Sequence, residues 1–186
     1  MRRVVVDALV SLDGYFAGPN DELDWFVMDD DSMGWSHDIL RKAGTILYGR
    51  VTYEGMAEYW TKAVDVDPFV KEKLNELPKV VFSHTLKHAT WNNTTLVRED
   101  PVAAVELLKQ QSGKDLVILG SGKLVAALAG ASLVDDYMLR LQPVILGAGR
   151  PLFESLPGYQ RLKLVSSKAF RSGVLGLHYQ PAAPEG

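Results

Sequence analysis

Cysteine is absent from the 186-residue sequence, and its absence excludes several kinds of chemistry. Disulfides, thiolate nucleophiles and cysteine-ligated zinc or iron–sulfur centres all require it. The four histidines show no metal-like clustering, since even His84 and His88 are separated by a turn-like stretch. The acidic run 29–31 lacks the glycine and distal glutamate of a calcium loop, so we read it as a solvated loop. We therefore predict no metal site.

Long hydrophobic runs and an excess of basic charge are also missing. No segment approaches the roughly 18 apolar residues of a membrane helix. The short apolar stretch after "MRR" is interrupted by Asp7 and Asp13, and it lacks the pattern of a secretory signal. A net charge of -3 gives no broad basic face for nucleic acid or anionic lipid. We expect a cytoplasmic protein with neither as a partner.

The residues that are present suit one globular domain, because 47% are hydrophobic and the chain is long enough to bury a core. We predict a domain over residues 1–180 and a loose tail over 181–186. Expected strands cover residues 3–9, 45–49, 79–83, 94–97, 116–119, 133–146, 161–170 and 174–180. Expected helices cover residues 32–42, 50–60, 68–75, 101–112 and 121–129, with Ser32 and Asp100 as N-caps and Gly44 and Gly113 as stops.

Strands alternate with helices through most of the chain, and this order predicts a largely parallel sheet with helices on both faces. The last two strands are joined through Ser172-Gly173, a typical hairpin signal. The expected fold class is therefore an α/β three-layer sandwich with a C-terminal antiparallel hairpin. In such folds ligands gather at the carboxyl ends of the strands.

Two of the expected strand ends carry glycine followed by the start of a helix. The first has Gly49, Arg50 and Thr52, and the second reads Gly120-Ser121-Gly122-Lys123. Glycine lets the backbone approach an oxyanion, and the free amides and dipole of a helix start favour negative charge. Arg50 and Lys123 add cations suited to phosphate.

Familiar phosphate motifs do not match these turns. A P-loop needs glycine where Val117 stands and Ser or Thr where Leu124 stands. A dinucleotide fingerprint needs Gly or Ala in place of Val125. Either turn alone could be a tight connection without a ligand. Together, each with its cation, they favour one extended ligand whose phosphates bridge both.

Five segments, in order, resemble the dihydrofolate-reductase-like family. They are "VSLDGYFAG", "LYGRVTYEGM", "VVFSHT", "VILGSGKLVAAL" and "QPVILGAGRPLFE". The likeness is greatest to the reductase domain of the bifunctional riboflavin-biosynthesis deaminase-reductase and its stand-alone bacterial relatives. It implies an NADPH-dependent oxidoreductase that transfers a hydride to a small heterocyclic substrate, as the riboflavin-pathway pyrimidine reductase does with 5-amino-6-(5-phosphoribosylamino)uracil. Related reductase domains often pair, so we expect a homodimer.

The resemblance also assigns cofactor-binding positions along the chain. By position, Gly49, Arg50 and Thr52 correspond to the segment that holds the cofactor phosphates. Three residues, Ser83, His84 and Thr85, correspond to the segment near the adenosine 2′-phosphate. The glycine turn against the pyrophosphate and nicotinamide ribose corresponds to Leu119, Gly120, Ser121, Gly122, Lys123 and Leu124. The nicotinamide wall and the mobile loop over it correspond to Ala8 and to residues 12–17, which include Gly14. No acidic residue is placed to accept from a ribose 2′-hydroxyl, whereas Arg50 can meet a 2′-phosphate, which favours NADP over NAD.

The catalytic residues are less clear than the cofactor residues. The pterin-orienting carboxylate of dihydrofolate reductases falls near Met33, which is apolar, and Asp38 lies about a turn too late. The resemblance matches Asp13 to a first-loop aspartate of the riboflavin-type enzymes, so Asp13 is our catalytic candidate; it could instead form a local turn with Gly14. Arg150 is a candidate for a substrate phosphate. Trp25 and Trp35, which could belong to the core, could instead stack on a flat heterocycle.

Three functions stay open on these residues. The first is the NADPH-dependent reductase. The second is a non-catalytic NADP(H)- or small-molecule-binding module on the same fold, suggested by the missing helix carboxylate. The third is a dimeric scaffold that binds no nucleotide. Hydride transfer is mainly cofactor chemistry, so the missing carboxylate does not exclude the enzyme.

Overall fold

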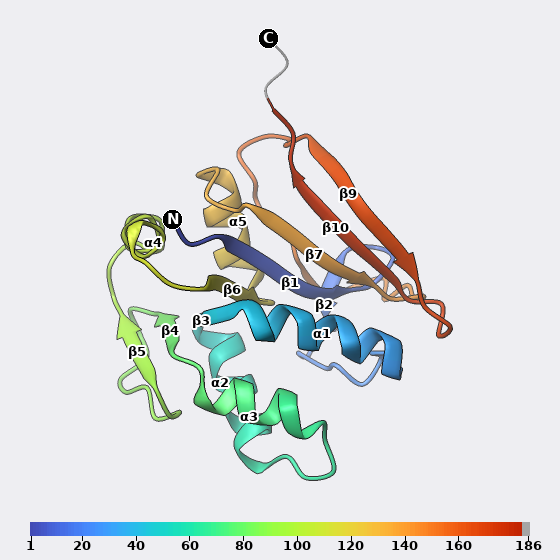
Figure 1. Ribbon diagram of the computed structural model, residues 1–186, viewed down its shortest axis with the longest axis horizontal. Coiled ribbons are helices and arrows are strands. Elements are labelled where there is room, and N and C mark those ends of the chain that lie inside the picture. The colour runs from blue at the N-terminus through green and yellow to red at the C-terminus, as the bar shows by residue number, and fades with distance from the viewer. Residues whose placement is uncertain (184–186) are drawn as a thin grey trace.

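The computed structural model of the protein describes residues 1–183 and divides them into ten strands and five helices (Figure 1). The strands are β1 (Val4–Val10), β2 (Tyr15–Ala17), β3 (Ala43–Gly49), β4 (Lys79–Phe82), β5 (Thr94–Val97), β6 (Asp115–Leu119), β7 (Asp136–Leu141), β8 (Arg150–Pro151), β9 (Leu162–Ala169) and β10 (Leu175–Pro181). The helices are α1 (Asp30–Lys42), α2 (Arg50–Lys62), α3 (Pro68–Glu76), α4 (Pro101–Gln110) and α5 (Gly122–Gly130).

Eight strands form one sheet in the order β5-β4-β3-β6-β1-β7-β10-β9. The pairs from β5 to β7 are all parallel, whereas β10 runs antiparallel to both β7 and β9. The hairpin β9–β10 forms one edge of the sheet and the short β5 forms the other (Figure 1). This arrangement confirms the predicted fold class, including the C-terminal hairpin.

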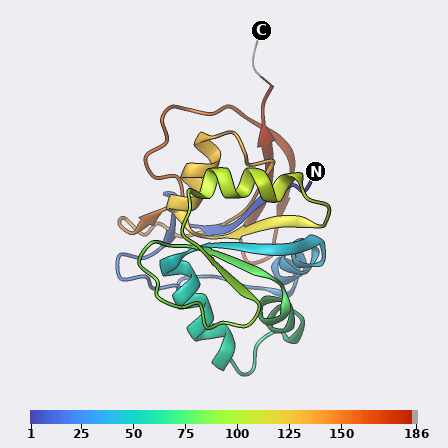
Figure 2. The same ribbon diagram turned by 90° about the vertical axis from the view of Figure 1, so that its left-hand side faces the viewer.

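Helices cover both faces of the sheet. On one face, α4 and α5 pack on a core that includes Val6, Ile118 and Leu128; on the other, α1, α2 and α3 pack around Tyr48 and Val81. Figure 2 shows α4 on one side of the sheet and α2 and α3 on the other. Successive residues of a strand point to opposite faces, so Val4, Val6 and Ala8 of β1 join the α4–α5 core while Val5 meets α1. Asp7 therefore lies on the α1 face.

Several element boundaries differ from the sequence predictions. The N-cap of α1 is Asp29, whose carboxylate accepts from Ser32 N at 2.7 Å, so Ser32 is the third helical residue and the run 29–31 is no loop. Gly44 lies inside β3, and α1 ends at Lys42; α4 ends at Gln110, before Gly113. The strand expected over 133–146 is shorter, because β7 ends at Leu141 and Pro143 cannot donate to a ladder.

A second, two-stranded sheet was missed by the sequence analysis. Its strands β2 and β8 pair antiparallel, with Tyr15 opposite Pro151, in segments for which we predicted no strand. The loose tail expected from residue 181 starts on the last residue of β10, and its residues 184–186 lie outside the described part of the chain. None of the helices over residues 1–183 has the length and apolar character needed to cross a membrane.

Candidate active site

The two glycine turns lie side by side at the carboxyl edge of the parallel strands. The Gly49 N–H at the end of β3 donates to Ser121 Oγ, just after β6, at 3.0 Å. A Cβ atom added to Gly120 would lie 3.6 Å from the methyl carbon of Thr52, so the start of α2 also touches this turn. The structure therefore brings together two segments that are far apart in the sequence. Their first residues, Gly49 and Leu119, are separated by 70 positions.

The second turn has an unusual backbone. Gly120 and Ser121 follow one another in the left-handed region, with φ of 61° and 64°. Serine rarely adopts this conformation, and a non-glycine residue held there costs free energy that the surrounding structure must offset. The Ser121 side chain is turned inward to the Gly49 amide, so it does not cap its own helix.

The helices that follow these two turns differ from the other three in their N-caps. The N-caps of α1, α3 and α4 are Asp29, Asp67 and Asp100, and the side chain of each accepts a hydrogen bond from a first-turn amide. The helices α2 and α5 have no side-chain cap and no acidic residue in the first turn. Their first-turn amides and helix dipoles are thus available to an anion at the same edge of the sheet.

The two-stranded sheet of β2 and β8 packs against the second glycine turn. A Cβ on Gly122 would lie 2.5 Å from the Pro151 carbonyl oxygen and 3.0 Å from the Phe16 ring. Residue 122 must therefore be glycine for β2 and β8 to approach. Because Phe16 belongs to the loop expected near the nicotinamide, this contact places that loop directly beside the turn.

The two predicted cations lie at the surface. Arg50 donates to Glu54 Oε2 at 2.8 Å, one turn along α2, and both side chains are nearly half exposed. Lys123 is exposed on the first turn of α5. An exposed ion pair of this kind is weak, so Arg50 can leave Glu54 for a phosphate at little cost.

The predicted 2′-phosphate segment borders the first turn. Phe82 pairs with Gly49, so Ser83 and Arg50 both follow directly from paired strand positions. The Ser83 hydroxyl accepts from Leu86 N at 2.9 Å and from Thr85 N at 3.2 Å, which shapes the segment. Arg98 braces it by donating to His84 O at 3.1 Å and to Leu86 O at 2.9 Å. Arg98 was not predicted from the sequence, where its only signal was its position directly after a strand.

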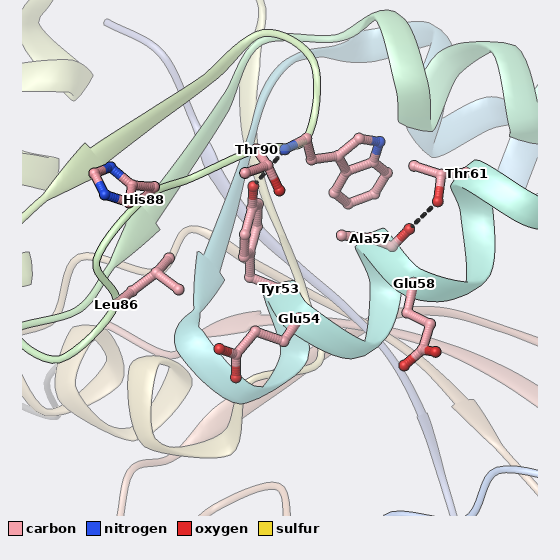
Figure 3. Close-up of a pocket in the computed structure, with 9 residues that line it drawn as sticks. Tyr53, Glu54, Ala57, Glu58, Thr61, Leu86, His88 and Thr90 are labelled. Atoms are coloured by element: carbon pink, nitrogen blue, oxygen red, sulfur yellow. Dashed lines mark hydrogen bonds between the residues drawn. The ribbon is translucent and has the colours of Figure 1, made fainter.

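A surface groove of about 360 Å³ lies between α2 and the segment that follows β4 (Figure 3). Its lining includes Leu86, His88 and Trp91 on one side and Glu54 and Glu58 on the other. Tyr53 OH accepts from Trp91 N at 2.9 Å and ties the two walls together. The two glutamates make the groove unsuitable for phosphate itself.

Asp13 is tied into the backbone of the neighbouring loop. Its carboxylate accepts from Ser11 Oγ at 2.7 Å, from Gly147 N at 2.7 Å and from Leu146 N at 3.1 Å. The Ser11 hydrogen bond, with help from the two amides, lowers the pKa of Asp13. Gly14 is left-handed with φ of 89°, and its carbonyl accepts from Leu152 N. The observed contacts are those of a structural tie, and substrate contact by Asp13 stays a prediction.

The remaining predicted residues lie around β1. Ala8 is buried in the α4–α5 core, and Leu124 of α5 belongs to the same core. Leu119 ends β6 opposite Asp7. The Gly120 N–H donates to the Asp7 carbonyl at 3.3 Å, so this part of β1 adjoins the glycine turn. Arg150 instead pairs with Asp21, with 2.9 Å between Nη2 and Oδ2.

A buried ion pair next to this turn was not predicted from the sequence. Asp7 accepts from Arg140 Nη2 with both carboxylate oxygens at 3.2 Å, and each side chain is about 5% exposed. Arg140 Nη1 also donates to Ser36 Oγ of α1. Burial raises the pKa of Asp7, and Arg140 offsets only part of that effect. The available signal was a charged residue among apolar ones in two strands: Asp7 in "VVVDALV" and Arg140 in "DYMLRL".

Comparison with known proteins points to one family. The sequence profile of the RibD C-terminal domain matches residues 2–175. YyaP of Bacillus subtilis, a protein of uncharacterized function, is 36% identical over 182 residues, which cover 96% of this chain and 94% of YyaP. A protein of Shewanella sp. PV-4, provisionally named for riboflavin biosynthesis, has a solved structure with a TM-score of 0.73 at 19% identity, covering 97% of this chain and 99% of its own.

A longer enzyme shares the same fold. The diaminohydroxyphosphoribosylaminopyrimidine deaminase/5-amino-6-(5-phosphoribosylamino)uracil reductase of Thermotoga maritima matches with a TM-score of 0.69 at 14% identity. The match covers 97% of this chain but 57% of the Thermotoga chain. At such identities the solved structures show a common fold, and the residues of this chain must carry any argument about its chemistry.

Proposed function

The chain belongs to the RibD C-terminal domain family, and from that premise we propose that it is an NADPH-dependent reductase. Its substrate is a small heterocycle that accepts a hydride, as in the pyrimidine-reduction step of riboflavin biosynthesis. Residues 1–180 form the reductase domain, and the protein acts as a homodimer in the cytoplasm.

One observation carries the proposal: the uncapped N-termini of α2 and α5 are joined through Gly49 N and Ser121 Oγ. Uncapped helix starts leave donors unsatisfied unless water or a ligand accepts from them. Two such starts at one edge match an extended ligand with several phosphates better than a single small anion. NADPH is a ligand of that kind.

The residues at this edge of the sheet contact different parts of the cofactor. In our proposal Gly49, Arg50 and Thr52 hold phosphate oxygens, and residues 119–124 hold the pyrophosphate and the nicotinamide ribose. Ser83, His84 and Thr85 border the adenosine 2′-phosphate, within reach of the Arg50 side chain once it leaves Glu54. The bound cofactor supplies the hydride. The chain's own contribution is to orient the two rings, with Phe16 and the Asp13-tied loop excluding water from the reacting edge.

The substitution Gly49→Asp tests this site without breaking the fold. The φ of Gly49 is -80°, and an added Cβ would lie 3.7 Å from Ser121 Oγ, so an aspartate fits. Its side chain would cap α2, which stabilises the helix by a few tenths of a kcal/mol (roughly 0.3) relative to a glycine cap, while its charge occupies the proposed phosphate site. We expect a higher melting temperature and NADPH affinity weakened at least about tenfold by calorimetry, a loss of about 1.4 kcal/mol.

The matched control is Gly49→Ala, which adds a Cβ but neither cap nor charge. It should retain NADPH affinity within about a factor of three, well under 1.4 kcal/mol. If wild-type protein binds no NADPH, or if Gly49→Asp binds it as tightly as Gly49→Ala, the proposed cofactor site is wrong.

A non-catalytic NADP(H)-binding module on the same fold is the second candidate. Two observations favour it: the Asp13 carboxylate is occupied by three donors, and Asp38 of α1 faces solvent in a pair with Arg41. Mixing NADPH with a panel of oxidised heterocycles and following the nicotinamide absorbance separates the two candidates. Oxidation of NADPH with any acceptor supports the enzyme, whereas tight binding without oxidation across the panel supports the binding module.

A further inference from the structure

The groove between α2 and residues 86–91 lies outside the proposed cofactor site (Figure 3). Its volume of about 360 Å³ is enough for one small molecule. Four residues of α2, at positions 54, 57, 58 and 61, form one of its walls, and spacings of three and four place them on one face of the helix. Thr52 of the same helix instead lies beside the Gly120 turn. The groove is therefore a separate cavity on a shared helix.

The two walls of the groove differ in chemistry. Glu54 and Glu58 belong to the α2 wall, and Leu86 and Trp91 belong to the opposite wall. Among residues 1–183, nine line the groove, and none of the nine is a lysine or an arginine. An organic cation complements such walls, because its charged group pairs with carboxylates while its stem covers apolar surface. The groove therefore favours a cation with an aliphatic stem.

A buried hydroxyl in the groove adds a second requirement. Tyr53 is 2% exposed, and its hydroxyl oxygen accepts from Trp91 N at 2.9 Å. Within residues 1–183 this hydroxyl donates no hydrogen bond, so its proton is left for an acceptor in the groove. Figure 3 shows the hydroxyl beside Thr90, at the end of the ring that points away from α2. A ligand that fits both features carries a cation at one end and a neutral oxygen acceptor at the other.

Arg50 links the groove to the proposed phosphate site. Its side chain donates to Glu54 Oε2 at 2.8 Å, and both side chains are nearly half exposed, so an exchange of partners costs little free energy. Capture of Arg50 by a cofactor phosphate takes the cation away from Glu54, and a cation in the groove can replace it. Conversely, a cation bound to Glu54 releases Arg50 for the phosphate. By thermodynamic linkage the two ligands raise each other's affinity by the same factor.

We propose that the groove is an effector site for a free small organic cation, and that this cation strengthens NADPH binding through Glu54 and Arg50. Glu54 and Glu58 bind the cationic group, and Leu86 covers its stem. The Tyr53 hydroxyl donates to the neutral oxygen of the ligand. The volume suits one free molecule and is far too small for the surface of a folded partner. Binding of the cation depends on the groove alone, whereas its effect on NADPH rests on the proposed function.

Two probes of the same shape test the binding. Nα-acetylargininamide carries a guanidinium group and amide oxygens, and Nα-acetylcitrullinamide replaces the guanidinium with a neutral urea. Both are titrated into the protein without NADPH by ligand-observed NMR. We expect the arginine compound to bind with a millimolar dissociation constant and the citrulline compound to bind at least about fivefold more weakly. Equal affinities, or no binding of the arginine compound at millimolar concentration, overturn the proposal.

The variant Glu58→Gln removes one charge of the groove and leaves the pair of Arg50 with Glu54 intact. Its affinity for the arginine compound should fall about threefold, and its affinity for the citrulline compound should not change. The control Glu106→Gln makes the same substitution at an exposed position of α4, away from the groove, and should bind the arginine compound like wild type. Equal affinities of the two variants for the arginine compound overturn the proposal.

The response to NADPH tests the coupling between the two sites. With saturating NADPH, the wild type should bind the arginine compound about threefold more tightly, a factor within the range of an exposed ion pair. Glu54→Gln should abolish this difference, while Glu106→Gln should keep it. If NADPH binds but leaves the affinity for the arginine compound unchanged, the coupling is wrong. If NADPH does not bind and the arginine compound still binds more tightly than the citrulline compound, the proposed function fails and the groove site stands.

Discussion

Gly122 approaches the carbonyl oxygen of Pro151 so closely that no side chain fits, whereas Gly55 in the middle of α2 has open space around it. We expect Gly122→Ala to destabilise the protein by about 2 kcal/mol, because the backbone of β8 must move. Gly55→Ala should stabilise it by about 1 kcal/mol, since alanine favours a helix interior. Denaturant unfolding measures both. Equal effects of the two substitutions would show that the Gly122 contact is unimportant.

Asp13 contributes to the pH dependence of stability. Its pKa is lowered from 3.8, chiefly by the Ser11 hydrogen bond, so the folded state favours the carboxylate. The stability it contributes is present above pH of about 4 and is lost as the pH falls through the folded-state pKa. Asp13→Ala should therefore melt below wild type at pH 7, and the difference should shrink as the pH falls below about 4 and the carboxylate becomes protonated. A difference that does not change with pH contradicts this role.

Single residues were predicted well where the local sequence decides the outcome and poorly where a distant partner does. The Asp-Pro start of α4 was predicted correctly, because the cap and its helix are adjacent in the chain. The cap of α1 was wrong because several polar residues precede the helix. Asp29 also receives the Ser172 N–H at 3.2 Å, a contact across 143 positions that the local sequence does not show. The pairing of Asp7 with Arg140 was unpredictable for the same reason.

At the scale of elements, Lys79 joins a helix to two neighbouring segments. Its buried ammonium donates to the carbonyls of Asn75, Leu77 and Asn92 at 2.8–3.0 Å and lies over the Trp91 ring. Lys79→Met keeps the length of the side chain but leaves three carbonyls without a donor. We expect a loss of about 3 kcal/mol in denaturant unfolding. Lys87→Met, at an exposed position, should be neutral, and equal effects would contradict the role of Lys79.

Elements with a strong pattern were found from the sequence, and elements defined by pairing were not. Each of the five helices was predicted, as were the strands of the parallel sheet, because apolar runs and turn residues mark them. The strands β2 and β8 have three and two residues, too few to show an alternation. They pack against Gly122 through Phe16 and Pro151, a contact between residues distant in the sequence, and that contact borders the candidate site.

At the scale of the whole molecule, β9 is a long unpaired edge. It runs for eight residues, and its Leu164 and Val165 are 48% and 46% exposed, whereas the opposite edge strand β5 has four residues. An exposed edge strand of that length, with two apolar side chains at its centre, can pair with another chain. We therefore predict that the homodimer forms through β9, and that wild-type protein sediments at twice its monomer mass.

A paired lysine substitution tests this interface. Leu164→Lys with Val165→Lys places two charges on the edge, and the protein should sediment as a folded monomer with unchanged circular dichroism. The control is Val64→Lys with Leu107→Lys, which adds the same charge at exposed apolar positions away from β9 and should leave the dimer intact. A monomeric wild type, or a dimer that survives the change at β9, would contradict this interface. Because the glycine turns lie on the other side of β1 and β7 from β9 in the strand order, the monomeric variant should still bind NADPH.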